Sequence, residues 1–186
     1  MNTKKRDLLG EIKAVRRRQS HPNFVFSATM ERLQKLHLLS NTEFGNSEEF
    51  ARYIPKAVVA ALQGFLRSVF GSMVDLGEPY SSRIAKYLKD KSRVTFDFVT
   101  VREIAEKNLT LGEFVAHCLS LNNFEDVIEW FSAILEAKFI EELKKQTHQD
   151  GNLIIENQAI FFEQINALFR ERHIFSHELA NHYSVS

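Results

Sequence analysis

Apolar side chains recur at steps of three and four residues along most of this chain, and few residues interrupt the pattern. Three prolines (Pro22, Pro55 and Pro79) and seven glycines are spread over its 186 residues. Because proline and glycine are the strongest helix breakers, their scarcity leaves room for long helices. The periodicity therefore predicts an all-α fold, a helical bundle built on a central antiparallel pair of long helices with additional shorter helices.

The longest apolar stripe lies in the middle of the chain. It opens at Asn46 and Glu49, which fit a helix start because both side chains can satisfy free backbone N–H groups of a first turn. Pro55 lies inside the stripe, removes one hydrogen bond, and should kink the helix or restart it. The stripe continues through Phe50, Tyr53, Ile54, Val58, Leu62, Phe65 and Val69. Further helices are predicted over 28–39, 81–90 and from about 155 onward.

Capping patterns and a connector divide the second half of the chain. Thr100 with Glu103 and Thr110 with Glu113 both fit the capping box, so each pair predicts a helix start. The stretch 92–101 alternates briefly without an obvious partner strand, and we interpret it as an extended connector.

One more helix is predicted to open at the sequence NNFED, residues 122–126. The polar segment that leads to Gly151 would end it. Its inner positions would be Val127, Phe131, Ile134, Leu135 and Leu143.

Composition narrows the class of protein. Lys and Arg together number 24, as do Asp and Glu, so there is no global positive field, and contact with nucleic acid would need a local patch. Cys118 is the single cysteine, which fits a reducing compartment. No apolar run approaches the roughly 18 residues of a membrane span. We therefore expect a cytoplasmic protein with no membrane association, folded as a single domain over residues 1–186.

The first 20 residues are basic, with seven Lys or Arg side chains against two acidic ones. Their apolar side chains form one stripe of Leu8, Leu9, Ile12 and Val15. One interpretation is an amphipathic helix whose basic face is solvated, and another is an edge that contacts phosphates. The bundle itself is expected to cover residues 28–182.

Residues that can carry chemistry gather near the C-terminus. Phe161, Ile165 and Leu168 form a core stripe, and Arg172 falls on its continuation, where an unpaired buried charge would be costly. On an unbroken helix, Arg170, His173 and His177 share a neighbouring face. Arginine can hold two phosphate oxygens, and histidine can exchange a proton near neutral pH. This cluster is what a phosphodiester site needs.

Three alternatives stay open for the same residues. His173 and His177 have the spacing of a metal-ligand pair, but His177 and His182 are five residues apart and miss the zinc-protease pattern. No Cys or Asp cluster supplies a third ligand, so neither a metal nor another cofactor is expected. Basic side chains can also simply stabilise a helix C-terminus. The third alternative is a tail of charged, solvated residues.

The segment Arg172–His177 has the form R-x4-H with a polar residue directly after the arginine. It resembles the motif of the HEPN superfamily, all-helical domains that carry R-x4–6-H late in the fold, including abortive-infection-like members. The run ALFRERHIFSHE is similar to the version in which the motif ends a long helix. ARYIPKAVVAALQGFLRSVF and LTLGEFVAHCLSLNNFEDVIEWF resemble the long early helix and the middle section of such domains.

The resemblance implies a metal-independent endoribonuclease of a toxin–antitoxin or phage-defence system, with RNA as its substrate. Such domains commonly form homodimers in which two copies of the motif meet in a cleft. Arg172 would hold the scissile phosphate, and His177 would take the proton from the attacking ribose 2′-OH. His173 would orient one of these groups or touch the phosphate, and Arg170, which fits the looser R-x6-H spacing, would add a phosphate contact.

One departure concerns regulation by a partner protein. Toxins of this superfamily that pair with a nucleotidyltransferase antitoxin often carry a Tyr two residues after the motif histidine, and here that position is Leu179. A cognate antitoxin or defence-system protein is therefore expected to act by another route. The alternative function is a non-catalytic HEPN-like domain that binds RNA, a nucleotide or a protein partner, which the balanced charge favours.

Overall fold

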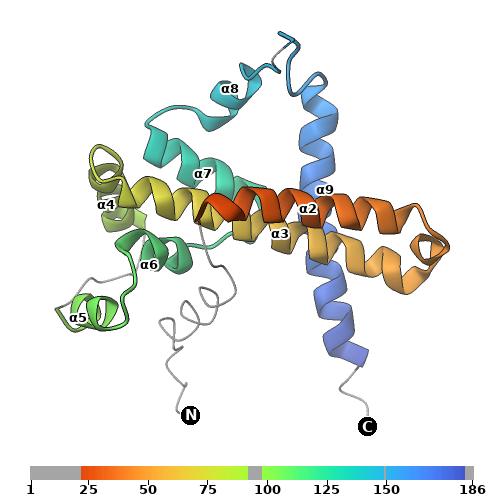
Figure 1. Cartoon of the computed structure of the whole chain (residues 1–186), viewed down its shortest axis with the longest axis horizontal. Coiled ribbons are helices and arrows are strands. Elements are labelled where there is room, and N and C mark those ends of the chain that lie inside the picture. Colours follow the sequence, from red (N-terminus) through yellow and green to blue (C-terminus); the bar gives the residue numbers. More distant parts are fainter. Residues whose placement is uncertain (1–21, 92–97, 149, 183–186) are drawn as a thin grey trace. The chain divides into compact units, whose positions relative to one another are not determined.

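A computed structural model describes residues 22–91, 98–148 and 150–182, and these residues are mostly helical (Figure 1). In this part of the chain there is no strand, and a single isolated bridge joins Thr147 to Leu153. The predicted all-α class is therefore confirmed. The basic helix predicted over 1–20 lies outside the described residues, as does most of the connector predicted over 92–101.

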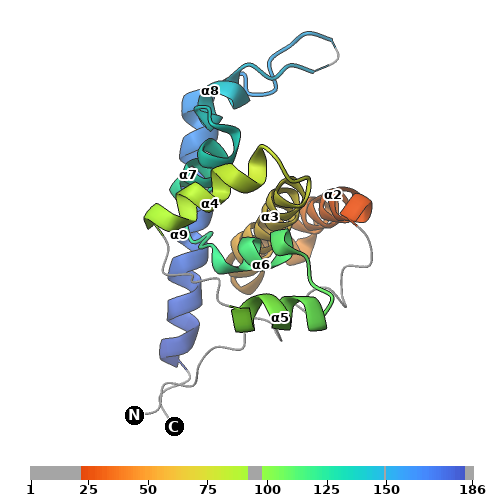
Figure 2. The same cartoon turned by 90° about the vertical axis from the view of Figure 1, so that its left-hand side faces the viewer.

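Most of the helices follow one another closely. In chain order they are α2 (Pro22–Ser40), η1, a 3-10 helix (Glu43–Asn46), α3 (Glu48–Asp75), α4 (Tyr80–Lys91), α5 (Phe98–Glu106), α6 (Leu111–Cys118), α7 (Phe124–Leu135), α8 (Phe139–Lys144) and α9 (Gln158–His182). The connection from α8 to α9 spans residues 145–157. Helices α2 and α3 lie side by side and run in opposite directions, as Figures 1 and 2 both show. They provide the antiparallel pair of long helices that the periodicity predicts.

The starts of α2 and α3 differ from the predicted ones. Helix α2 begins at Pro22, six residues before the predicted position 28, because proline fits a first turn in which its missing N–H has no role. Helix α3 begins at Glu48, so Ser47 directly precedes it in place of the predicted Asn46, and the Ser47 Oγ accepts from the Phe50 N–H at 3.2 Å. It runs without a restart through Pro55, which is buried.

The chain divides into two compact units that share α3. Unit 1 comprises Met1–Phe26 and Phe65–Ser120, so its described elements are the start of α2, the second part of α3, α4, α5 and α6. Unit 2 comprises Ser27–Gly64 and Leu121–Ser186 and includes α7, α8 and α9. The single domain over 1–186 stays a prediction.

In unit 1, α6 approaches α3 at two glycines. A Cβ on Gly112 would lie 2.0 Å from the carbonyl oxygen of Gly71, so the two backbones touch directly. The Gly112 N–H donates to Asp75 Oδ1 at 2.8 Å. Thr110 and Glu113 form the predicted capping box at the start of α6. The unit 1 core then closes around Phe70, Val74, Ile84, Leu88, Ile104, Leu109, Phe114 and Val115.

The second predicted capping box is wrong. Thr100 and Glu103 lie inside α5, which begins at Phe98, so the segment from Phe98 to Val101 is helical and not an extended connector. A Thr-x-x-Glu pattern is also common inside exposed helices, where it carries no capping role.

Arg67 joins α3 to α6 in unit 1 through its guanidinium. It is half-buried and donates to the carbonyl oxygens of Ala116 and Leu119, at the C-terminal end of α6. Free carbonyls at a helix end attract a cation, so this contact satisfies acceptors that α6 leaves open.

We expect Arg67→Met to lower the free energy of unfolding by about 2 kcal/mol, the scale of hydrogen bonds to a charged group. Urea titration of the two proteins measures this. Arg52→Met on the same helix is the control, because Arg52 pairs with Glu48 at the surface and should cost less than about 0.5 kcal/mol. Equal costs for the two substitutions would contradict the role of Arg67.

Helix α3 bears on the expectation that no apolar run approaches the length of a membrane span. By length and composition alone it could cross a membrane, and Arg67 is the one charged residue in the stretch 57–74. The core helix of a soluble protein meets the same criterion, and a third of the apolar window is buried here. Val59 and Phe70 of this helix are almost fully buried within the chain's own units.

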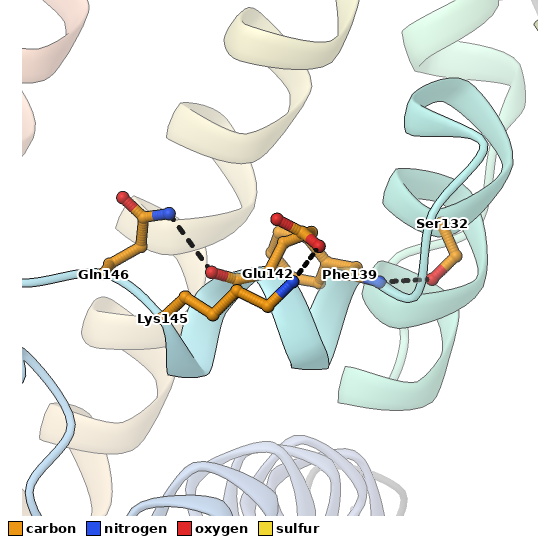
Figure 3. A network of polar contacts seen from close by, with 5 residues as sticks. All are labelled: Ser132, Phe139, Glu142, Lys145 and Gln146. Carbon is orange, nitrogen blue, oxygen red and sulfur yellow. Dashed lines mark hydrogen bonds and ion pairs between the residues drawn. The ribbon is translucent and has the colours of Figure 1, made fainter.

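In unit 2, the helix predicted from NNFED to Leu143 is two helices. Helix α7 opens in the predicted segment NNFED, where Asn123 caps it by accepting from the Asp126 N–H at 2.7 Å, but α7 ends at Leu135 because Glu136 adopts a left-handed conformation. Figure 3 shows the turn into α8, where the Phe139 N–H donates to Ser132 Oγ at 3.1 Å.

Helix α8 is short, and local contacts hold it against α7. The ring of Phe139 stacks on Phe131 with centroids 5.1 Å apart. At its end, Lys145 pairs with the Glu142 carboxylate at 2.7 Å and Gln146 donates to the Glu142 carbonyl at 3.1 Å (Figure 3). Leu143 is thus an inner position of a separate helix and not of α7.

Candidate functional site

The candidate residues all lie on α9, which Asn157 caps by accepting from the Ile160 N–H at 3.1 Å. The helix packs against α7, where the rings of Phe124 and Phe162 lie 6.0 Å apart. Phe169, at 4% exposure, is its most buried described side chain. The half-buried side chains follow the same stripe: Phe161, Phe162, Ile165, Leu168, Arg172 and Phe175.

Arg172 therefore lies on the inward stripe of α9, as the spacing predicts, and is half-buried. Among the described residues, no carboxylate forms an ion pair with it. An arginine at such a position keeps its charged head in water while its stem covers apolar neighbours. Its guanidinium is thus available to an external anion.

Arg170 and His173 are exposed on α9, outside its inward stripe. The helix continues without a break through His177, although the side chain of His177 is outside the described part of the chain. At about 100° per residue, Arg170, His173 and His177 fall within an arc of roughly 60°. The register brings these three positions to one side of the helix, as the sequence predicts.

The same register separates the two residues of the R-x4-H pair. Arg172 and His177 are about 140° apart around α9 and about 7.5 Å apart along it. In one copy of the chain, a phosphate held by Arg172 and a group approached from position 177 would lie on different sides of the helix. One continuous α9 thus does not bring this pair together by itself.

Acidic side chains interrupt the positive charge of α9. Its sequence holds Glu163, Glu171 and Glu178 against Arg170 and Arg172, so with His neutral the helix has a net charge of −1. The field along this helix is consequently weak, so recognition of RNA here would depend on direct contacts to phosphate. The strongly basic segment 1–20, with a net charge of +5, lies outside the described residues.

The other residues with possible chemistry are less suited to a site. In the described part of the chain there is no group of three or more His, Cys, Asp or Glu side chains that could hold a metal ion. Ser176, to which the sequence pattern assigns no role, lies within the motif, but its Oγ donates to the Arg172 carbonyl at 2.7 Å. A hydroxyl engaged in its own helix is a poor nucleophile.

Cys118 is not an activated nucleophile either. Burial raises the pKa of its thiol to about 11, and the positive charge of Arg67 offsets only part of this. The thiolate fraction near neutral pH is then about a hundredfold smaller than for an ordinary cysteine. The reaction rate falls by less than this, because a more basic thiolate is also the stronger nucleophile.

We expect iodoacetamide to alkylate Cys118 at pH 8 at least roughly tenfold more slowly in the folded protein than in the urea-unfolded chain. The folded rate should keep rising with pH up to about 11. Mass spectrometry of timed samples measures both rates. A folded cysteine that reacts as fast as the unfolded one would contradict this environment.

No family model, no curated protein and no solved structure matches this chain.

Proposed function

We propose that this protein is a metal-independent endoribonuclease of a toxin–antitoxin or phage-defence system, active in the cytoplasm as a homodimer. The observation that carries the proposal is Arg172: a half-buried arginine on the inward stripe of α9, without an ion pair to any described residue, five residues before a histidine. A site for a phosphodiester needs first of all a cationic side chain that the phosphate can reach.

The register of α9 supports a composite site. Because positions 172 and 177 are about 140° apart around one helix, we infer that a second copy is needed to place both groups at one phosphate. A two-fold axis beside the end of α9 would bring Arg172 of one copy toward the partner's His177, and the reverse pair would form symmetrically.

The chemistry assigned to the site needs no metal. The imidazole of His177 takes the proton from the ribose 2′-OH as the 2′ oxygen forms a bond to phosphorus. The bond from phosphorus to the 5′ oxygen breaks, and that oxygen takes a proton from water. Arg172 stabilises the charge that develops on the phosphate. The products are a 2′,3′-cyclic phosphate end and a 5′-hydroxyl end.

Arg170 and His173 have supporting roles in this proposal. Both are exposed on the side of α9 where position 177 also falls. Arg170 would contact a neighbouring phosphate, and His173 would orient the scissile one. Together they follow the nucleic-acid backbone without reading bases. Any cognate antitoxin or defence-system protein would cover this exposed side.

The proposal is tested with the purified protein and a mixed, end-labelled RNA in excess EDTA. We expect cleavage that yields 2′,3′-cyclic phosphate ends, and no cleavage of a matched RNA whose 2′-OH groups are methylated. Cleavage that requires a divalent cation, or equal cleavage of the methylated RNA, would contradict the mechanism. Binding of RNA without any cleavage would favour the non-catalytic alternative.

A further inference from the structure

An apolar groove of about 520 Å³ runs along unit 1, between the start of α2 and the last turns of α3. Two of its lining side chains are strongly exposed, Phe26 at 58% and Leu76 at 74%. Such exposure of large apolar groups around one groove is typical of a surface that binds another segment. Its apolar lining consists of Val25, Phe26, Phe65, Val69, Met73 and Leu76.

We propose that residues 1–20 of the same chain dock in this groove as an amphipathic helix, with the stripe of Leu8, Leu9, Ile12 and Val15 against its apolar lining. These residues are outside the described part of the chain, and the inference rests on their sequence and on the groove that is described. It is independent of the proposed RNA cleavage.

The segment 1–20 ends directly beside the groove. Residue 22 starts α2, and Val25 and Phe26 of that helix already line the groove. The seven steps from Val15 to Pro22 can span at most about 25 Å when extended, which exceeds the roughly 16 Å that the groove covers along the chain from Phe65 to Leu76, so the stripe can reach the groove. A tether this short also gives an effective concentration on the order of millimolar, so a modest apolar contact is sufficient for docking.

The length of the stripe matches that of the groove. The groove positions on α3 and directly after it run from Phe65 to Leu76, eleven steps or about 16 Å at helical rise. The stripe from Leu8 to Val15 covers seven steps, about 10 Å as a helix. A helix of this size fits within the groove and would cover its exposed apolar side chains.

The charges of the groove and of residues 1–20 also match. The described lining of the groove carries no charged side chain, while Asp75 and Glu78 are exposed at its α3 end. Hydrogen bonds from Ser82 and Ser81 lower the pKa of the Glu78 carboxyl, which keeps it ionised. Residues 1–20 carry a net charge of +5. An apolar groove with an acidic end therefore complements a basic amphipathic helix.

Disulfide trapping in the full-length protein tests this docking. Ser72 is exposed and lines the groove, so the double variant Ile12→Cys/Ser72→Cys places one thiol on each surface. The matched control is Ile12→Cys/Ala60→Cys, because Ala60 is exposed on the same helix, about 18 Å from position 72. Native Cys118 stays in both variants, since burial keeps its thiol protonated.

Under mild oxidation we expect the 12–72 disulfide to form within one chain at least tenfold faster than the 12–60 disulfide. Adding Leu8→Asp and Leu9→Asp should remove this advantage. Equal rates at positions 72 and 60, or a rate unchanged by the aspartates, would overturn the docking. A 12–72 disulfide between two chains would assign the groove to a second copy. Binding of residues 1–20 to phosphatidylserine vesicles without trapping would assign them to a membrane surface.

Discussion

Replacing Arg172 or His177 with alanine is expected to abolish RNA cleavage, a loss of at least about a hundredfold for either residue. His177→Ala removes the group that accepts the 2′-OH proton, and Arg172→Ala removes the cation that stabilises the phosphate. The effect is measured as the initial rate of cleavage in EDTA with RNA in excess over enzyme.

Two substitutions on α2 are matched controls. Arg32 and His37 are both exposed there, so Arg32→Ala and His37→Ala remove the same side-chain types without touching α9. Both controls should cleave at the native rate. Circular dichroism should give the same helix content in all four variants. Substantial residual activity in both Arg172→Ala and His177→Ala would contradict the assignment of the site.

Gly112→Ala is expected to destabilise the fold more than any other single methyl group added in unit 1. Its Cβ would lie 2.0 Å from the Gly71 carbonyl oxygen and 2.8 Å from the Asp75 Cγ, so α6 must move away from α3. Overpacking against backbone costs about 3 kcal/mol, which lowers the melting temperature of a chain this long by roughly 10 °C.

Gly71→Ala is the control on the facing helix. Its Cβ would meet the Gly112 carbonyl oxygen at 3.1 Å, which a small adjustment relieves. Because alanine also favours the helical state by about 1 kcal/mol, the net change should be near zero. A melting temperature of Gly112→Ala within about 2 °C of the native value would show that the two helices are not in direct backbone contact.

Features that depend on neighbouring residues were predictable from the sequence. The capping box of Thr110 and Glu113 joins groups three residues apart and formed as predicted, and α7 opens within the predicted segment NNFED. The same holds for α9, a regular helix on which spacing alone places Arg172 on the inward stripe and Arg170 with His173 on the exposed side.

Features that depend on distant contacts were not predictable. The break between α7 and α8 contains no glycine or proline that would signal it. Glu136 takes the left-handed conformation there, and stacking of Phe139 on Phe131 fixes α8 in place. The contact of Gly71 with Gly112 joins residues 41 positions apart, and Arg67 finds its acceptors 49 and 52 residues away. Periodicity carries no information on such pairings.

The positions of the candidate residues on α9 were predictable from the sequence. Whether one chain contains the whole site was not. Spacing identifies which positions share a side of α9, and the continuous helix agrees with it. Whether Arg172 and His177 act at one phosphate depends on a second copy, because about 140° separates them on one helix. Subunit complementation therefore tests the composite site most directly.

The measurement mixes equal amounts of the Arg172→Ala and His177→Ala proteins, lets their subunits exchange, and assays RNA cleavage in EDTA. In a mixed dimer, Arg172 of one subunit and the partner's His177 form one intact site of the two. With half of the dimers mixed, activity should return to about a quarter of the native level. Two inactive proteins that stay inactive after exchange, although native dimers cleave, would contradict a site shared between subunits.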